Sequence, residues 1–163
     1  MSGSPTLGTL LRHLIESLDS AVDQAYARAG LDYKARYTPI IRALCALGPA
    51  TIRAISVQAG ITHSAASQTL SQMAQRGLVS AEPGEDARER IIALTPAAQA
   101  MLPALERQWA ATEAAARGLD EELGLSLPDV LLRTLQLLER RSFSERIEDA
   151  ASSRKPPRMK GKP

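Results

Sequence analysis

Apolar side chains recur every three or four residues along the first part of the chain. The positions are Leu7, Leu11, Leu14, Leu18, Val22 and Ala25. This spacing is the period of an α-helix, so it predicts one amphipathic helix over about residues 6–29, which Gly30 ends. A second helix is predicted after Pro39, a residue that suits a first turn, and it ends before Gly48. The apolar stripe of the first helix is broad enough to seat a partner helix.

Two short helices with a tight connection come next. Thr51 is suited to cap a helix over residues 52–59, and Thr62 a helix over residues 63–76. Gly60 and Gly77 end these two helices. Because residues 60–62 leave so little chain between them, the pair is typical of a helix-turn-helix motif.

The pattern then changes from helical to β-like. Residues 78–81 and 90–94 are short β-prone runs around a polar, turn-rich stretch, which predicts a β-hairpin with a long charged tip. Thr95-Pro96 opens a long helix to about residue 122, and Ser126 caps a last helix to about residue 148. The predicted fold is mainly α with a small β-hairpin wing: a winged helix-turn-helix with further helices before and after it.

The helix over residues 63–76 has two unlike faces. Its apolar side holds Ala66, Leu70, Met73 and Ala74. The opposite side holds neutral hydrogen-bonding groups, with Gln72 at its border: Ser64, Ser67, Gln68, Ser71 and Gln75. A face without carboxylates can enter a major groove without repelling phosphates, and Gln and Ser can bond base edges there. The N–H groups near Thr62, His63 and Ser64 suit a phosphate. The alternative is an ordinary polar surface helix.

The tip of the predicted hairpin carries a second candidate contact. Asp86 stands two residues before Arg88, so its carboxylate can brace the guanidinium through a charged hydrogen bond. A braced Arg88 is suited to a narrow minor groove, and Arg90 to the phosphate backbone. The alternative is a solvated, charged hairpin tip.

These motifs occur together in one order. They are the run 51–70, Gly77-Leu78-Val79, Asp86-Ala87-Arg88 and Leu94-Thr95-Pro96, with Arg88 seven residues before Thr95. In this combination residues 36–119, and less specifically 6–148, resemble the MarR family of bacterial winged helix-turn-helix regulators. The resemblance implies a transcriptional regulator, expected to be a repressor, that binds double-stranded DNA at a pseudo-palindromic operator.

The resemblance also implies how the chain is organised. Residues 1–149 would form a single domain, with a winged helix-turn-helix at 36–95 and dimerisation helices at 6–35 and 96–149. The partner would be a second copy of the chain, and a small molecule would release the dimer from DNA. The expected DNA-contacting residues are Thr62, His63, Ser64, Ser67, Gln68, Ser71, Gln72, Asp86, Arg88 and Arg90.

Aromatic residues gather where the first predicted helix ends and the second begins. Tyr26, Tyr33 and Tyr37 lie there with Arg36. Aromatic groups beside a cation suit a phenolic or carboxylate ligand. In relatives a sensory pocket lies between the dimerisation lobe and the winged module. The alternative is that these tyrosines are core and interface residues.

The sequence offers few other residues that are suited to catalysis, metal binding or redox sensing. Cys45 is expected to be a small core residue, with a redox-sensing thiol as the alternative. The two histidines, His13 and His63, are far apart, so no metal site or cofactor is expected. No phosphate loop or nucleophile elbow is present, and we expect no enzyme. No apolar run is long enough for a membrane span and no secretory signal is seen, which predicts a cytoplasmic protein.

Charge is unevenly distributed. Residues 150–163 carry five basic side chains and no acidic one, so the preceding part has a net charge of −3 within a total of +2. We expect this tail to be disordered and to act mainly as a solvated end. The alternative is that its positive charge aids binding to a polyanion. Residues 51–94 carry four basic and four acidic side chains. Their neutrality keeps another class of function open, a winged-helix protein-interaction module that does not read DNA.

Overall fold

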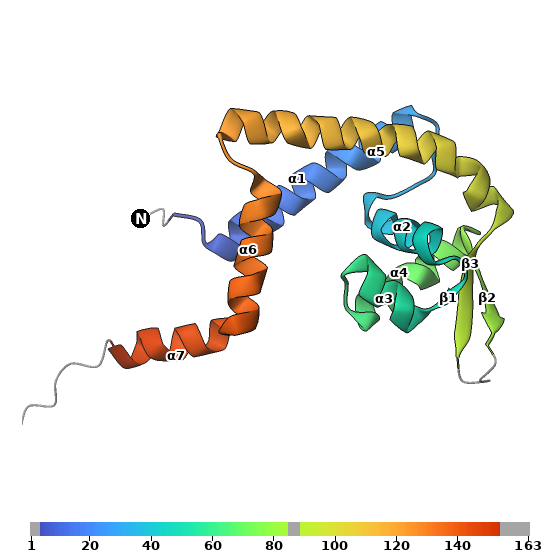
Figure 1. Ribbon diagram of the computed structural model, residues 1–163. Coiled ribbons are helices and arrows are strands. Elements are labelled where there is room, and N and C mark those ends of the chain that lie inside the picture. Colours follow the sequence, from blue (N-terminus) through green and yellow to red (C-terminus); the bar gives the residue numbers. More distant parts are fainter. Residues whose placement is uncertain (1–3, 85–88, 154–163) are drawn as a thin grey trace, which may run out of the picture. The chain divides into compact units, whose positions relative to one another are not determined.

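The computed structural model describes residues 4–84 and 89–153 (Figure 1). The elements in chain order are α1 (Leu7–Arg28), the 3-10 helix η1 (Ala35–Tyr37), α2 (Thr38–Leu47), β1 (Ala50–Thr51), α3 (Ile52–Ala59), α4 (His63–Gln75), β2 (Val79–Pro83), β3 (Arg90–Leu94), α5 (Pro96–Leu123), α6 (Leu127–Arg140) and α7 (Phe143–Ser153). The predicted fold class, mainly α with a small β-hairpin wing, is confirmed. Among the described residues, no helix has the length and low polarity that crossing a membrane requires.

The chain divides into two compact units within α5. The first unit is Met1–Thr112 and holds the winged helix-turn-helix together with α1 and the first part of α5. The second unit, Glu113–Pro163, holds the rest of α5 with α6 and α7. The single domain predicted for residues 1–149 stays a prediction.

The two helices of the helix-turn-helix begin where the sequence predicts. The side-chain oxygen of Thr51 accepts a hydrogen bond from the N–H of Ala54 at 3.2 Å, and that of Thr62 does the same for Ala65. Between the helices Gly60 has φ +66°, a left-handed conformation that glycine adopts without steric cost. These local contacts define both helices before any long-range packing is considered.

The sheet has three antiparallel strands in the order β1-β3-β2. The β2–β3 hairpin confirms the predicted wing, with Val79 opposite Leu94 and Pro83 opposite Arg90. The strand β1 was not predicted; it has two residues, and Ala50 in it lies opposite Ile92. Because β1 leads directly into α3, its pairing ties the wing to the start of the helix-turn-helix.

The core of the first unit joins the wing, the helix-turn-helix and the long helices. Its buried members include Ile40, Ile41, Leu44, Ile55, Leu70, Met73, Leu78, Val79, Ile92 and Leu105. Ala66, Leu70 and Met73 are buried, as the helical pattern predicts. Ala74 is exposed, so its predicted inward position is wrong. It stands one position after Met73, about 100° around the helix, at the edge of the buried stripe.

A cluster of aromatic side chains joins α1, η1 and α5. The rings of Tyr26 and Tyr33 lie edge to face with centroids 4.8 Å apart, and those of Tyr33 and Tyr37 at 5.7 Å. Trp109 Nε1 donates a hydrogen bond to Tyr26 Oη at 3.1 Å, and Tyr26 Oη also bonds Thr38 Oγ1 at 3.3 Å. Directional hydrogen bonds therefore supplement apolar packing where the long helices meet α2.

The second unit corrects the prediction of one last helix to about residue 148. The first helix, α6, ends at Arg140, and a second helix, α7, begins at Phe143 after the capping residue Ser142. The N–H of Ser142 donates to Glu145 Oε2 at 2.7 Å and the N–H of Glu145 donates to Ser142 Oγ at 3.3 Å, which is a capping box. These bonds from Ser142 lower the pKa of the Glu145 carboxyl.

Because α7 continues to Ser153, the predicted disorder is wrong for residues 150–153. Residues 154–163 lie outside the described residues.

Tyr26→Phe is expected to lower the free energy of unfolding by about 1–2 kcal/mol, because Trp109 Nε1 loses its acceptor in a part-buried position. Urea unfolding measures this change. Tyr37→Phe is the matched control, since Tyr37 Oη is buried without a partner among the described residues. Removing that hydroxyl should be neutral or stabilising, and equal losses in both variants would contradict the assignment.

Candidate nucleic-acid interface

The structure exposes the polar face of α4. The side chains at Ser64, Ser67, Gln68, Ser71 and Gln75 are all exposed. Leu70 and Met73 turn the opposite face into the core. The 13 residues of α4 include no acidic side chain, so this face offers only neutral donors and acceptors.

Gln72 is placed differently from the rest of the predicted contact residues. Its side chain is half-buried, and Oε1 is enclosed without a hydrogen-bond partner among the described residues. In this conformation the carbonyl oxygen of Gln72 is not available to a base edge. Gln68 and Ser64 are exposed, by contrast, and the contact of Gln72 with DNA stays a prediction.

The N-terminal end of α4 is open to solvent. Thr62 and His63 are exposed, and Thr62 Oγ1 satisfies the N–H of Ala65. The N–H groups of a first helical turn have no acceptor within the helix, and their partial positive charge favours an anion. The structure thus brings Thr62, His63 and Ser64 to one exposed helix end.

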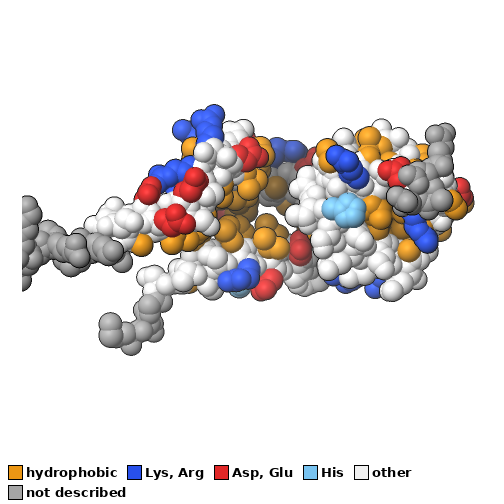
Figure 2. All heavy atoms as spheres, turned by 90° about the horizontal axis from the view of Figure 1, so that it is seen from below, with side chains coloured by type: hydrophobic (Ala, Val, Ile, Leu, Met, Phe, Trp, Pro, Cys, Tyr) orange, Lys and Arg blue, Asp and Glu red, His pale blue; other side chains and the backbone are white. Residues whose placement is uncertain are grey.

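The molecular surface on this side is mostly uncharged. Figure 2 views the molecule from below, and the winged part appears mostly white and orange, with a few blue and red side chains. Arg90 is exposed on β3 and Glu82 on β2. Asp86 and Arg88, the predicted brace at the wing tip, lie outside the described residues.

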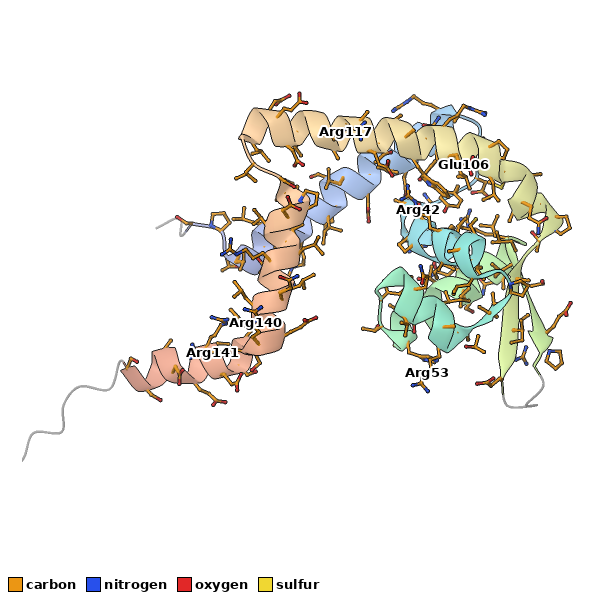
Figure 3. The ribbon with its side chains drawn as sticks, in the orientation of Figure 1. Arg42, Arg53, Glu106, Arg117, Arg140 and Arg141 are labelled. Carbon is orange, nitrogen blue, oxygen red and sulfur yellow. The ribbon has the colours of Figure 1, made fainter. Side chains whose placement is uncertain are left out.

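Arg53 is a candidate contact that the sequence analysis missed. It is exposed at the second position of α3 and points toward the side to which the β2–β3 hairpin extends (Figure 3). The first helix of a helix-turn-helix crosses the nucleic-acid backbone, so a cation here is suited to a phosphate. A basic residue two positions after the capping Thr51 was the available signal in the sequence.

The predicted ligand residues are split between core and surface. Tyr26, Tyr33 and Tyr37 are buried in the core, whereas Arg36 is exposed with its guanidinium carbon 5.6 Å from the centre of the Tyr37 ring. Burial raises the pKa of the Tyr33 hydroxyl above its usual value. This arrangement favours the alternative in which the tyrosines are core residues.

Arg36 instead lines an open cleft with charged neighbours. The cleft has a volume of about 330 Å³ and is bordered by Asp19, Asp23, Lys34, Ala35 and Arg36. Asp23 bonds Lys34 Nζ at 3.1 Å and the N–H of Ala35 at 2.7 Å. Burial, and then the neighbouring Asp23, raise the pKa of the Asp19 carboxyl. A ligand here would meet charged groups rather than tyrosine hydroxyls.

Cys45 is exposed, so its predicted place in the core is wrong. It follows Leu44 on α2, and the buried face of that helix turns Ile41 and Leu44 inward instead. Loss of solvent around the thiol, and then the Glu106 carboxylate, raise the pKa of Cys45 above its usual value. Figure 3 shows Glu106 on α5 facing α2. A raised pKa disfavours the thiolate, which opposes the redox-sensing alternative.

Metal ligands are not clustered in the described part of the chain, where no group of three His, Cys, Asp or Glu side chains is suited to hold an ion. What the geometry offers instead is a pair of capped helices, an exposed uncharged face on the second of them, and a β-hairpin beside it. These features define a winged helix-turn-helix protein.

Residues 30–89 match the family model described as MarR family. The predicted resemblance to the MarR family of transcriptional regulators is confirmed for this part of the chain. No curated protein sequence matches the chain.

Solved structures share the fold over most of the chain. The transcriptional regulator MOSR of M. tuberculosis, in complex with DNA, is 21% identical, covers 93% of this chain and 100% of its own, and has a TM-score of 0.62. The transcriptional repressor CouR, bound to a 23-mer DNA duplex, is 21% identical over 82% and 92% of the two chains, with a TM-score of 0.60. BpsR of Bordetella bronchiseptica is 18% identical over 76% and 96%, with a TM-score of 0.52.

The environment of Cys45 generates a pH-dependent prediction. A thiol with a raised pKa holds less thiolate near neutral pH, so alkylation of Cys45 by iodoacetamide at about pH 7.5 should be slower than that of an unperturbed cysteine peptide. Glu106→Gln removes one cause of the shift and should speed the reaction. At a pH above the pKa of Cys45 in both proteins, the wild type and Glu106→Gln should react equally fast. An alkylation profile shifted to lower pH than the peptide's would contradict the assignment.

Proposed function

We propose that the chain is a homodimeric repressor that binds a pseudo-palindromic site in double-stranded DNA and is released by a small molecule. The two copies of α4 enter successive major grooves, and the wings reach the flanking minor grooves or the backbone. The proposal includes no catalytic step.

The observation that carries this proposal is the uncharged, exposed face of α4. Exposed helices usually carry charged side chains, whereas α4 presents Ser64, Ser67, Gln68 and Ser71 without any carboxylate. Neutral donors and acceptors of this kind read base edges, and Gln is suited to a bidentate contact with adenine. The solved complexes of MOSR and CouR with DNA support this interpretation of the shared fold.

Exposed apolar side chains support the homodimer. On α1 they are Leu7, Leu10, Leu11, Ile15 and Leu18, and on α6 they are Val130, Leu131, Leu132, Leu135 and Leu137. Neither α6 nor α7 has any buried residue within the described chain. Apolar surface on this scale marks a protein–protein contact. A second copy of the chain would bury it and would supply the second recognition helix.

One of the similar solved structures supports release by a small molecule. The DNA binding of BpsR is regulated by 6-hydroxynicotinic acid, which is an aromatic carboxylic acid. Such a ligand has the chemistry that a cation such as Arg36 would bind. We therefore propose an aromatic or carboxylate ligand for this chain.

Gln68→Ala should weaken binding to the specific site by about 1–3 kcal/mol if Gln68 makes a bidentate base contact, with little change on random DNA. Arg53→Ala should instead weaken binding to both DNAs alike and reduce the slope of log K against log salt by about 1.8, because each of the two copies in the dimer loses one phosphate contact. Both are measured by fluorescence anisotropy over a salt series, with DNA from beside the protein's own gene as the specific duplex.

The two variants serve as controls for each other. An equal loss on specific and random DNA for Gln68→Ala would remove Gln68 from base reading. A wild-type chain that binds neither duplex would overturn the proposed function and would favour the protein-interaction alternative.

Leu135→Asp should break the dimer. Leu135 is 58% exposed in the single chain, so the substitution leaves the fold of that chain intact. Burying the new carboxylate in an interface should raise the dimer dissociation constant by about 100-fold or more. Sedimentation equilibrium measures this constant, and operator binding should fall with it because two half-sites need two recognition helices.

Gln136→Asp is the matched control for Leu135→Asp. It places the same charge at the next, polar position and should remain dimeric. A dimeric Leu135→Asp, or a monomeric wild type at micromolar concentration, would end this part of the proposal.

A further inference from the structure

The C-terminal end of α4 is held from two sides. Arg76, which caps the helix, forms an ion pair with Asp32 in the loop between α1 and η1. Across the same turn, Thr95 Oγ1 donates a hydrogen bond to the carbonyl of Gly77 at 2.6 Å, and the N–H of Thr95 donates to the carbonyl of Leu78 at 3.1 Å. Asp32 is 44 residues from Arg76 in the sequence, so the ion pair is a tertiary contact on α4.

The loop that carries Asp32 is itself fixed to the aromatic cluster. The N–H of Leu31 donates to the carbonyl of Tyr26 at 2.9 Å, and the N–H of Tyr33 donates to the carbonyl of Leu31 at 2.9 Å. The ring of Tyr33 packs against Tyr26, whose hydroxyl accepts from Trp109 on α5. A continuous series of contacts therefore runs from α5 through α1 to the end of α4.

The seam between α4 and η1 is not held by other polar contacts of comparable strength among the residues described. Gln72 lies four residues before Arg76, about one helical turn earlier on α4. Its Oε1 and the hydroxyl of Tyr37 on η1 are both buried without hydrogen-bond partners in the described part of the chain. A buried polar group without a partner adds no directional contact that would set the tilt of α4. The Asp32–Arg76 ion pair consequently has a larger part in setting the position of α4.

The geometry of a helix amplifies a change at its end. With 13 residues, α4 is about 20 Å long, so a tilt of about 10° around its C-terminal end moves its N-terminal end by about 3 Å. Hydrogen bonds to base edges tolerate only a few tenths of an ångström in length. A contact far from the base-reading residues can therefore decide whether they reach their partners.

We propose that Asp32 and Arg76 are positioning residues for base recognition, and that their ion pair ties the tilt of α4 to the α1–η1 loop and its aromatic cluster. This inference rests on the proposed function. In this proposal the α1–η1 loop sets the tilt at which α4 meets the DNA. Neither the exposed face of α4 nor the wing has that role.

An electrostatic role and a positioning role for Asp32 predict opposite changes in affinity for the specific DNA when its carboxylate is removed. Its side chain is 83% exposed, and an exposed ion pair adds little to the stability of the fold. A carboxylate near DNA repels phosphates, so removing it should tighten binding to every DNA if charge alone matters. A positioning role predicts weaker binding to the specific site in spite of that more favourable charge.

The test is the affinity of full-length Asp32→Ala for the specific duplex and for a random duplex. We expect a loss of about 3- to 10-fold on the specific duplex, the range of coupling through such contacts, and equal or tighter binding to the random one. Glu82→Ala is the matched control, because it also removes one exposed carboxylate. Glu82 lies on β2 opposite Ile91 of β3, away from the α1–η1 loop in the sequence. It should tighten binding to both duplexes.

A double-mutant cycle tests whether the two side chains act as a pair. The ratio of specific to random affinity in Asp32→Ala/Arg76→Ala should be no lower than in Arg76→Ala alone. Hydrogen exchange of the free protein gives an independent measurement. The amides of Arg76, Gly77 and Leu78, which bond Gln72, Ala74 and Met73, should exchange faster in Asp32→Ala.

The outcomes separate the two proposals. A wild type that binds both duplexes equally would overturn the proposed function. If the wild type prefers the specific duplex and Asp32→Ala prefers it by the same ratio, the positioning role alone is overturned. Unchanged exchange at the end of α4, or a strictly additive cycle, would overturn it too.

Discussion

Tyr26 stands near the end of α1, and its hydroxyl joins that helix to two others. It accepts a hydrogen bond from Trp109 on α5 and bonds Thr38 at the start of α2. Only 1% of the Tyr26 side chain is exposed, so water does not compete with these bonds. Because hydrogen bonds are directional, they orient the long helices as well as attach them. The loop after α1 and the end of α4 then take their places from this junction.

The proposed mode of recognition depends on a surface with little charge. The α4 helix carries no acidic side chain, and residues 51–94 together are neutral. Phosphate contacts supply most of the affinity for random DNA, so a neutral module binds weakly without the right sequence. Arg53 on α3 and Arg90 on β3 are exposed cations, but the equal number of acidic side chains over residues 51–94 prevents a basic field. Discrimination between sites would then come mainly from hydrogen bonds to base edges, which require an accurately placed helix.

Local chemistry explains both the successes and one failure of prediction. Thr51, Gly60 and Thr62 set the ends of α3 and α4 through contacts within three residues, so sequence spacing was enough to locate them. The capping box of Ser142 and Glu145 is equally local, yet it was missed because an apolar helical pattern continues across it. The strand β1 was missed for a different reason. Two residues carry no pattern of their own, and only pairing with β3 makes them a strand.

The sequence by itself determined the elements, their order and the polar face of α4, because caps, turns and helical periodicity act between residues close in the chain. Tertiary structure decided which side chains on those elements are available. It exposed Cys45, and it left the buried hydroxyl of Tyr37 and the enclosed Oε1 of Gln72 without partners among the described residues. It also brought Asp32 to Arg76 across 44 residues. Burial and long-range pairing depend on how elements pack against one another, and periodicity within one element does not contain that information.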